Sequence, residues 1–190
     1  NVEIAYMYDN NTGNLWIDKI EGKIEEVDTG LIKNAGFELG TNSWGVWNAN
    51  GKLGTTIDST EKYEGNQSFK MFNSTQAEAG RGTVAQIISG MESAQGKKLV
   101  LTQAFKSENL QGNGVAIRVR LLNKNKEQIG DLITYKIDIK DNTDWIEKTI
   151  EIAIPSDTNI KNVEIAYMYD NNTGNLWIDD ISGKIINSNA

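Results

Sequence analysis

Carboxylates are the first candidates for acid–base chemistry in this chain, because its 190 residues contain no histidine and no cysteine. That absence excludes Ser-His-Asp and Cys-His catalysis, His-ligated metals, zinc–thiolate sites and disulfides. Paired carboxylates serve most glycosidases. Glu147 and Glu151 share one face of an expected strand, but at ~13 Å they are too far apart for either glycosidase geometry. The acidic residues therefore favour a protein without catalytic activity.

Tryptophans are the next residues with a chemical use. Trp44 and Trp47 lie in the Gly- and Asn-rich loop GTNSWGVWNANG (40–51) rather than in an alternating strand. Tryptophan is commonly packed in the core, yet this loop offers little to bury two indoles, so we expect at least one exposed ring. A flat aromatic face suits the C–H groups of a sugar ring. Trp177 sits at a strand position typical of packing, whereas Trp145, at a strand start, fits either role.

Polar side chains on the expected strands are candidates for contacts with a ligand. Arg118 and Arg120 share the strand face opposite the apolar positions, which fits either a solvated surface or a ligand contact. Gln103 is in phase with apolar residues, where an unpaired amide would cost roughly 1–3 kcal/mol. Either its amide is satisfied internally, or that face is a binding groove. Gln86, in the segment VAQII, poses the same question.

Alternation of apolar and polar residues with period two dominates the chain and must position these groups. Strands are expected over 53–58, 67–73, 83–88, 99–106, 115–121, 132–139, 150–154, 163–167 and 176–181. Turn signals such as GNG (112–114) separate them, and no segment has a convincing helical stripe. The pattern predicts an all-β fold, a β-sandwich of jelly-roll type with antiparallel sheets.

A long internal repeat predicts the domain organisation. Residues 1–24 recur as residues 162–185, with only Lys19/Asp180 and Glu21/Ser182 differing. We therefore expect a tandem array. In it, residues 1–24 are the last strands of a preceding copy, 25–30 a linker, 31–186 a complete module and 187–190 a tail. Because residues 1–24 would compete with 162–185 for one place in a sheet, we expect them to be mobile or docked on a neighbouring molecule as a swapped hairpin.

Charge and hydropathy exclude two classes of partner. The formal charge is −7 and no basic cluster is longer than Lys97-Lys98, so a phosphate backbone would be repelled. No stretch approaches the ~18 consecutive apolar residues of a membrane span. Neither nucleic acid nor a membrane span is therefore expected.

The opening and closing motifs of the module carry a resemblance to a known group. The module opens LIKNAGFELGTNSWGVW (31–47) and closes GNLWIDDISGKI (174–185), with YEGNQSFKMF, KLVLTQAFKSE and DWIEKTIEIAIP between them. This order resembles the jelly-roll carbohydrate-binding modules of bacterial plant-polysaccharide hydrolases, families 4, 9, 16 and 22. The tandem arrangement is most similar to family 16, whose sites combine tryptophan platforms with glutamines. The implied carbohydrate-binding residues are Trp44, Trp47, Gln86, Gln103, Arg118, Arg120 and Trp145.

The same resemblance implies a structural Ca²⁺ ion. Similar modules hold it with a Glu of the opening GFE, an Asp of the closing strand and groups near the loop before the SFK-like strand. The matching positions are Glu38 and Asp179, with Glu61, Glu64 and the Gly36 carbonyl as further donors. For the closing acids, solvation of the strand end and turn formation is the alternative. Because the first repeat keeps Asp18 but has Lys19 in place of Asp180, Asp179 is the better ligand.

Two functions from different classes are open. The resemblance implies a secreted or cell-surface, non-catalytic module that holds an attached glycoside hydrolase at β-1,4-linked plant polysaccharide: cellulose, glucomannan or mannan. The alternative is a structural or adhesive repeat of a bacterial surface protein, with the same fold and no glycan site. Retardation of the protein by soluble glycans distinguishes the two.

Overall fold

The structure is a computed structural model that describes residues 30–73 and 78–188. The repeated segment 1–24 and nearly all of the expected linker lie outside the described residues. The strands are β1 (Gly45–Asn48), β2 (Leu53–Asp58), β3 (Ser68–Asn73), β4 (Gly80–Ser89), β5 (Lys97–Gln111), β6 (Val115–Leu122), β7 (Gln128–Ile137), β8 (Asp141–Ala153) and β9 (Asn162–Asn187). One short 3-10 helix, η1 (Met91–Ala94), precedes β5. No helix within the described ranges is long and apolar enough to cross a membrane.

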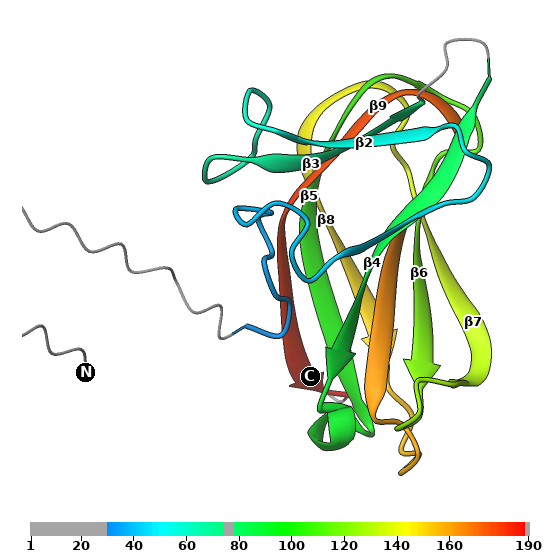
Figure 1. The fold of residues 1–190 in the computed structure, drawn as a ribbon. Helices are drawn as coiled ribbons and strands as arrows, with labels where there is room; N and C mark the ends of the chain where they lie inside the picture. The colour runs from blue at the N-terminus through cyan, green and yellow to red at the C-terminus, as the bar shows by residue number, and fades with distance from the viewer. Residues whose placement is uncertain (1–29, 74–77, 189–190) are drawn as a thin grey trace, which may run out of the picture.

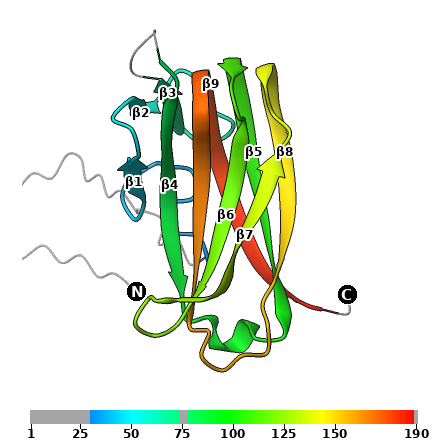
Figure 2. The same cartoon turned by 90° about the vertical axis from the view of Figure 1, so that its right-hand side faces the viewer.

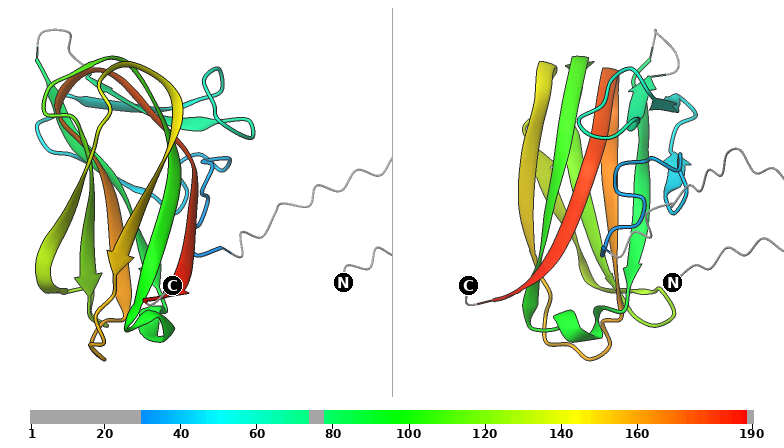
Figure 3. Two further views of the ribbon diagram at one scale, coloured as in Figure 1. Left: turned by 180° about the vertical axis from the view of Figure 1, so that it is seen from behind. Right: turned by 90° about the vertical axis from the view of Figure 1, so that its left-hand side faces the viewer.

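Strand β9 organises the fold because it is the central strand of both layers (Figure 1). Its first half pairs with β4 and β6, and its second half with β3 and β5. Sheet A therefore has the order β1-β4-β9-β6-β7, and sheet B the order β2-β3-β9-β5-β8, with every pair antiparallel. Figure 2 shows β4, β9 and β6 side by side, and the right panel of Figure 3 shows β8, β5 and the red half of β9. The expected antiparallel β-sandwich is confirmed.

The core lies between the sheets and follows from the period-two alternation. In β6, Val115, Ile117 and Val119 are at most 3% exposed, while Arg118 and Arg120 belong to the opposite face. Burial of each such aliphatic side chain contributes roughly 1.5–3 kcal/mol. Polar residues of sheet A are thereby directed to its outer face, where a ligand has access.

The segment before β1 closes one side of the core without forming a strand. Phe37, fully buried, stacks on Phe69 of β3 with ring centroids 5.1 Å apart, and lies 5.2 Å from Trp44. The Trp44 ring lies 6.0 Å from that of Tyr167 in β9, and its Nε1–H donates to the carbonyl of Asn34 at 3.0 Å. Aromatic contacts therefore hold this segment against both sheets.

Candidate functional site

The outer face of sheet A carries a cleft of about 490 Å³. Its lining residues are Gly45, Val46 and Trp47 of β1, Thr83 and Ala85 of β4, Arg118 and Arg120 of β6, Gln128 and Leu132 of β7, and Glu164 and Ala166 of β9. The register pairs Ala85 with Ala166 and Ala166 with Arg118. Ala85 and Ala166 thus leave room above the middle of the sheet, while larger side chains come from the edge strands β1 and β7, from β6 and, at Glu164, from β9.

Trp47 is the most accessible large apolar side chain of the cleft. It is 59% exposed, and Val46 and Leu132, which also line the cleft, are 44% and 43% exposed. Gly82 sets the position of β1, because a Cβ atom there would lie 2.3 Å from the carbonyl oxygen of Trp47. Only a glycine lets the two backbones approach this closely. The expectation of an exposed ring in segment 40–51 is met by Trp47, but the expectation of a loop there is corrected, because Trp47 lies in strand β1, which pairs with β4.

The two arginines of β6 both reach the cleft but are used differently. Arg120 forms a two-point ion pair with Glu164, whose Oε1 lies 2.8 Å from the arginine Nε. The hydrogen bond to Glu164 raises the pKa of Arg120. Arg118, one alternation earlier, has a buried Nε without a hydrogen-bond partner among the described residues. Among the described residues of the lining Glu164 is the only carboxylate, so these residues offer no acid–base pair.

Three residues expected at the ligand instead belong to the protein interior, which corrects the sequence-based site. Trp44 is 6% exposed and packed between Phe37 and Tyr167. The amide of Gln86 is 5% exposed and bonds both the N–H and the carbonyl of Lys33 at 2.8 Å, so it ties the segment before β1 to β4.

Gln103 is fully buried, and its amide is satisfied internally. Its Nε2 donates to the carbonyl of Lys148, and its Oε1 accepts from the Tyr167 hydroxyl at 3.1 Å. Of the two readings that the sequence left open for Gln103, the structure therefore selects the internal one. The physical reason is that its face of β5 points between the sheets and not to solvent.

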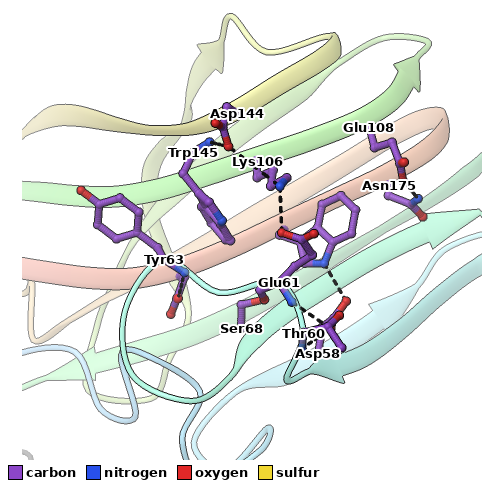
Figure 4. A network of polar contacts seen from close by, with 12 residues as sticks. Asp58, Thr60, Glu61, Tyr63, Ser68, Lys106, Glu108, Asp144, Trp145 and Asn175 are labelled. Atoms are coloured by element: carbon purple, nitrogen blue, oxygen red, sulfur yellow. Dashed lines mark hydrogen bonds and ion pairs between the residues drawn. The ribbon is translucent and has the colours of Figure 1, made fainter.

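Trp145 lies on the other sheet, beside a groove of about 430 Å³ (Figure 4). The groove is lined by Glu61, Lys106, Ser107, Glu108, Asn142, Thr143, Asp144 and Trp177. Trp145 packs against Tyr63 with ring centroids 5.8 Å apart, and Tyr63 is 42% exposed. Trp145 is thus separate from the cleft that contains Trp47 and the arginines.

The polar groups of the groove bond one another. Lys106 Nζ lies 2.7 Å from Glu61 Oε2, a hydrogen bond that raises the pKa of Lys106 (Figure 4). The buried Trp177 donates its indole N–H to Asp58 at 2.9 Å. Partial burial alone would raise the pKa of Asp58, but hydrogen bonds from Thr60, Trp177 and backbone N–H groups lower it below its ordinary value.

The expected calcium ligands come together in part. A Cβ atom at Gly36 would lie 3.6 Å from Asp179 Oδ1 and 3.9 Å from Glu38 Cγ, so both acids flank this glycine. Glu61 is instead paired with Lys106, and Glu64 is exposed and bonds Asp179 only through its backbone N–H. No three acidic, histidine or cysteine side chains group as a metal site within the described residues. An ion here would rely on two carboxylates and backbone oxygens.

Glu38 and Asp179 hold the loop between β2 and β3. Glu38 Oε1 accepts the N–H groups of Asn66 and Gln67, at 2.7 and 3.0 Å. Asp179, which is fully buried, accepts those of Tyr63 and Glu64. Burial raises the pKa of Asp179 despite these hydrogen bonds, whereas hydrogen bonds from Asn66 and Gln67 outweigh desolvation and lower that of Glu38. A cation beside Asp179 would offset the cost of burying its charge.

Sequence reasoning identified Trp47, Arg118 and Arg120 but missed the other residues of the lining, of which Val46, Gln128, Leu132 and Glu164 have the larger side chains. Glu164 gave a usable signal, because it alternates with the buried Val163 and Ile165 as Arg120 does with Val119. Val46 and Leu132 gave none, since an exposed apolar residue looks the same as a buried one in the sequence, and Gln128 gave none because a polar residue is ordinary on any solvent-facing strand. Their role depends on which strands lie at the edges of sheet A.

No protein-family model and no curated protein matches the chain. Solved structures share its fold. The enzymatically active domain of bacteriophage CBA120 tailspike protein 4 matches with a TM-score of 0.68 and 16% identity over 83% of this chain, which spans only 21% of the tailspike chain. TmCBM61, in complex with β-1,4-galactotriose, matches at 0.57 and 18% identity, covering 82% and 97% of the two chains. A family 16 carbohydrate-binding module matches at 0.56 and 16% identity, covering 82% and 99%. The chain has the β-sandwich fold of carbohydrate-binding modules.

Proposed function

We propose that this protein is a non-catalytic carbohydrate-binding module that binds a glycan chain in the cleft of sheet A. The observation that carries the proposal is the 59% exposed Trp47 beside a cleft floored by alanines. An indole face packs against the axial C–H groups of a sugar, while polar neighbours bond its hydroxyls. The fold shared with carbohydrate-binding modules supports this reading.

The glycan class that we propose is β-1,4-linked plant polysaccharide, with cellulose, glucomannan and mannan as the first candidates. The support is the order of motifs from LIKNAGFELG to GNLWIDDISGKI, which resembles family 16 and its relatives. In this proposal the module is secreted or displayed on a bacterial surface and keeps an attached glycoside hydrolase near its substrate. Tandem copies would raise avidity by effective concentration, without new contacts.

Affinity electrophoresis of the full chain in gels with soluble glycans tests the proposal. We expect retardation by glucomannan or a β-glucan, and its loss in Trp47→Ala, because truncating a binding aromatic typically costs at least about 2 kcal/mol. Trp145→Ala is the matched control and retains binding. No retardation by any glycan would favour a structural or adhesive repeat instead, and loss only in Trp145→Ala would move the site to the groove. Reducing-sugar release from the same glycans would contradict the absence of catalysis.

We also propose that Glu38 and Asp179 hold a structural Ca²⁺ with the Gly36 carbonyl. The support is the convergence of both acids on Gly36 and the buried charge of Asp179. We expect the melting temperature to rise with CaCl₂ and to fall with a chelator, because an ion that binds only the folded state stabilises it. Asp179→Asn should abolish the response, and Glu61→Gln, whose carboxylate pairs with Lys106, should keep it. An identical melting temperature in calcium and chelator would refute the site.

A further inference from the structure

The cleft of sheet A is a cationic region in an acidic protein. Its lining contains Arg118 and Arg120 against the single carboxylate of Glu164, whereas the whole chain has a formal charge of −7. The groove of sheet B has the opposite balance, with Glu61, Glu108 and Asp144 against Lys106. A neutral ligand gives no reason for a positive excess in the cleft of an acidic protein.

The excess positive charge of the cleft lies on Arg118. The neighbour of Arg120 across the strand pair is Glu164, which binds its guanidinium at two points. The neighbours of Arg118 are Ala166 on β9 and Thr134 on β7, and neither offers a negative charge. Its Nε is buried without a hydrogen-bond partner among the described residues. Because no described group of the protein bonds this guanidinium, an acceptor that enters the cleft can bind it without breaking an internal contact.

The chemistry of the Arg118 guanidinium indicates which group of a ligand would accept its hydrogen bonds. Its planar fork of N–H groups matches the two oxygens of a carboxylate, and a charged partner gives a stronger hydrogen bond than a hydroxyl. A sugar that carries a carboxylate is a uronic acid. Trp47 lines the same cleft and offers a face for the neutral ring of an adjoining residue.

We infer that the polysaccharide bound in this cleft is acidic, and that Arg118 pairs with the carboxylate of a uronic-acid residue. This inference rests on the proposed function and narrows it to β-1,4-linked backbones that carry uronate groups. The pairing also implies that affinity falls as ionic strength rises, because the cleft is open to solvent and its charges are screened.

Calorimetric titration of the full chain with glucuronoxylan, and with the same glycan after reduction of its carboxyl groups to alcohols, tests the inference. The two ligands differ only in the charged group. We expect the acidic form to bind about tenfold or more tightly at low salt, as for a charge-assisted hydrogen bond. Arg118→Gln should remove that advantage, and Arg118→Lys should keep only part of it, because an ammonium lacks the fork.

The control is Lys136→Gln, which removes one exposed positive charge from β7 outside the cleft lining. It should keep the preference for the acidic form, and thermal unfolding should verify that every variant is folded. Three outcomes would each overturn the inference and leave glycan binding intact. The parent could bind the two forms equally, it could bind neutral glucomannan more strongly, or Lys136→Gln could lose the preference as fully as Arg118→Gln. A folded parent that binds none of these glycans would overturn the proposed function as well.

Discussion

The cleft of sheet A and the groove of sheet B both combine aromatic and charged side chains, but of the two only the cleft has a buried polar group without a hydrogen-bond partner among the described residues. In the groove, Lys106 bonds Glu61, Trp177 donates to Asp58, and Glu108 accepts from Asn175. These bonds attach the turn after β2 to β5 and β9 across the outer face of sheet B. A ligand entering there would have to break contacts that the protein already makes.

The cleft shows the reverse arrangement. Trp47, Val46 and Leu132 are exposed around it, and Arg118 has no partner among the described residues. Exposed apolar side chains gathered in one hollow are unfavourable in water, and this favours the cleft over the groove as the proposed binding surface. In this protein, the satisfaction of polar groups, more than concavity or aromatic content, distinguishes the structural network of the groove from the proposed binding site in the cleft.

Removing the central aromatic of the groove should have the largest effect on stability. Trp177 is 3% exposed, with Lys70 Nζ 4.5 Å from its ring centroid. We expect Trp177→Ala to lower the free energy of unfolding by about 3–5 kcal/mol in urea denaturation. The substitution leaves a cavity and removes the hydrogen bond from the indole N–H to Asp58. Trp47→Ala, its counterpart in the cleft, should stay within about 0.5 kcal/mol of the parent. A stable Trp177→Ala protein without glycan binding would reverse the roles of the two regions.

A methyl group at Gly82 should disturb the cleft through β1. The added Cβ would collide with the carbonyl oxygen of Trp47, so β1 must move and carry Trp47 with it. We expect Gly82→Ala to cost about 1–3 kcal/mol of stability and to weaken glycan binding. Gly45→Ala is the control for stability, because its Cβ meets only the Ala85 carbonyl at 3.9 Å. Parent-like stability and binding in Gly82→Ala would show that this contact does not position Trp47.

Asp58 should make the groove a source of acid sensitivity. Its pKa is lowered in the folded state, so its contribution to stability is complete above the ordinary carboxyl pKa and is lost as the pH falls through the lower folded value. At pH 7, the free energy of unfolding of Asp58→Asn should therefore be about 1–2 kcal/mol below that of the parent. On acidification, the free energy of unfolding should fall less in Asp58→Asn than in the parent. Urea unfolding at pH 7 and at about pH 2.5 measures both, with Asp131→Asn on β7 as the control for one lost charge. Parallel pH profiles for Asp58→Asn and the parent would contradict this role.

The ion pair at the rim of the groove should have the smallest effect. Glu61 and Lys106 are partly exposed, and such pairs contribute about 0.2–1 kcal/mol. We expect Glu61→Gln to lower the free energy of unfolding by no more than that, and to leave glycan retardation unchanged. Weaker glycan binding in Glu61→Gln would mean that the groove, too, contacts the ligand.

Strand content was the part of the fold that could be predicted well. Period-two alternation located β2 at Leu53–Asp58 and most of β3, β4, β5 and β6. The segments 163–167 and 176–181 were predicted as separate strands, but both belong to β9. The turn-like NNTGN between them lies where β9 passes from sheet A to sheet B, with Asn171 and Gly174 at positive φ. Local turn chemistry looks the same in a loop and in a strand that changes sheets.

The candidate site could be predicted only in part, and the two tryptophans of segment 40–51 show why. Trp44 and Trp47 have the same type and nearly the same neighbours in the chain. Trp44 meets Phe37 and Tyr167, which are brought to it by distant strands, whereas Trp47 pairs with Thr83 at the edge of sheet A and stays exposed. No local pattern distinguishes these outcomes.

By itself, the sequence determined most of the strand pattern, the alternation of faces within those strands and the absence of histidine and cysteine chemistry. These follow from side-chain type and the two-residue period of a strand, which are local properties. Tertiary structure decided which faces meet. It buried Gln103 against Tyr167 and paired Arg120 with Glu164. It also left Arg118 and Trp47 open to one cleft, because the register of strands far apart in the chain sets which side chains are satisfied.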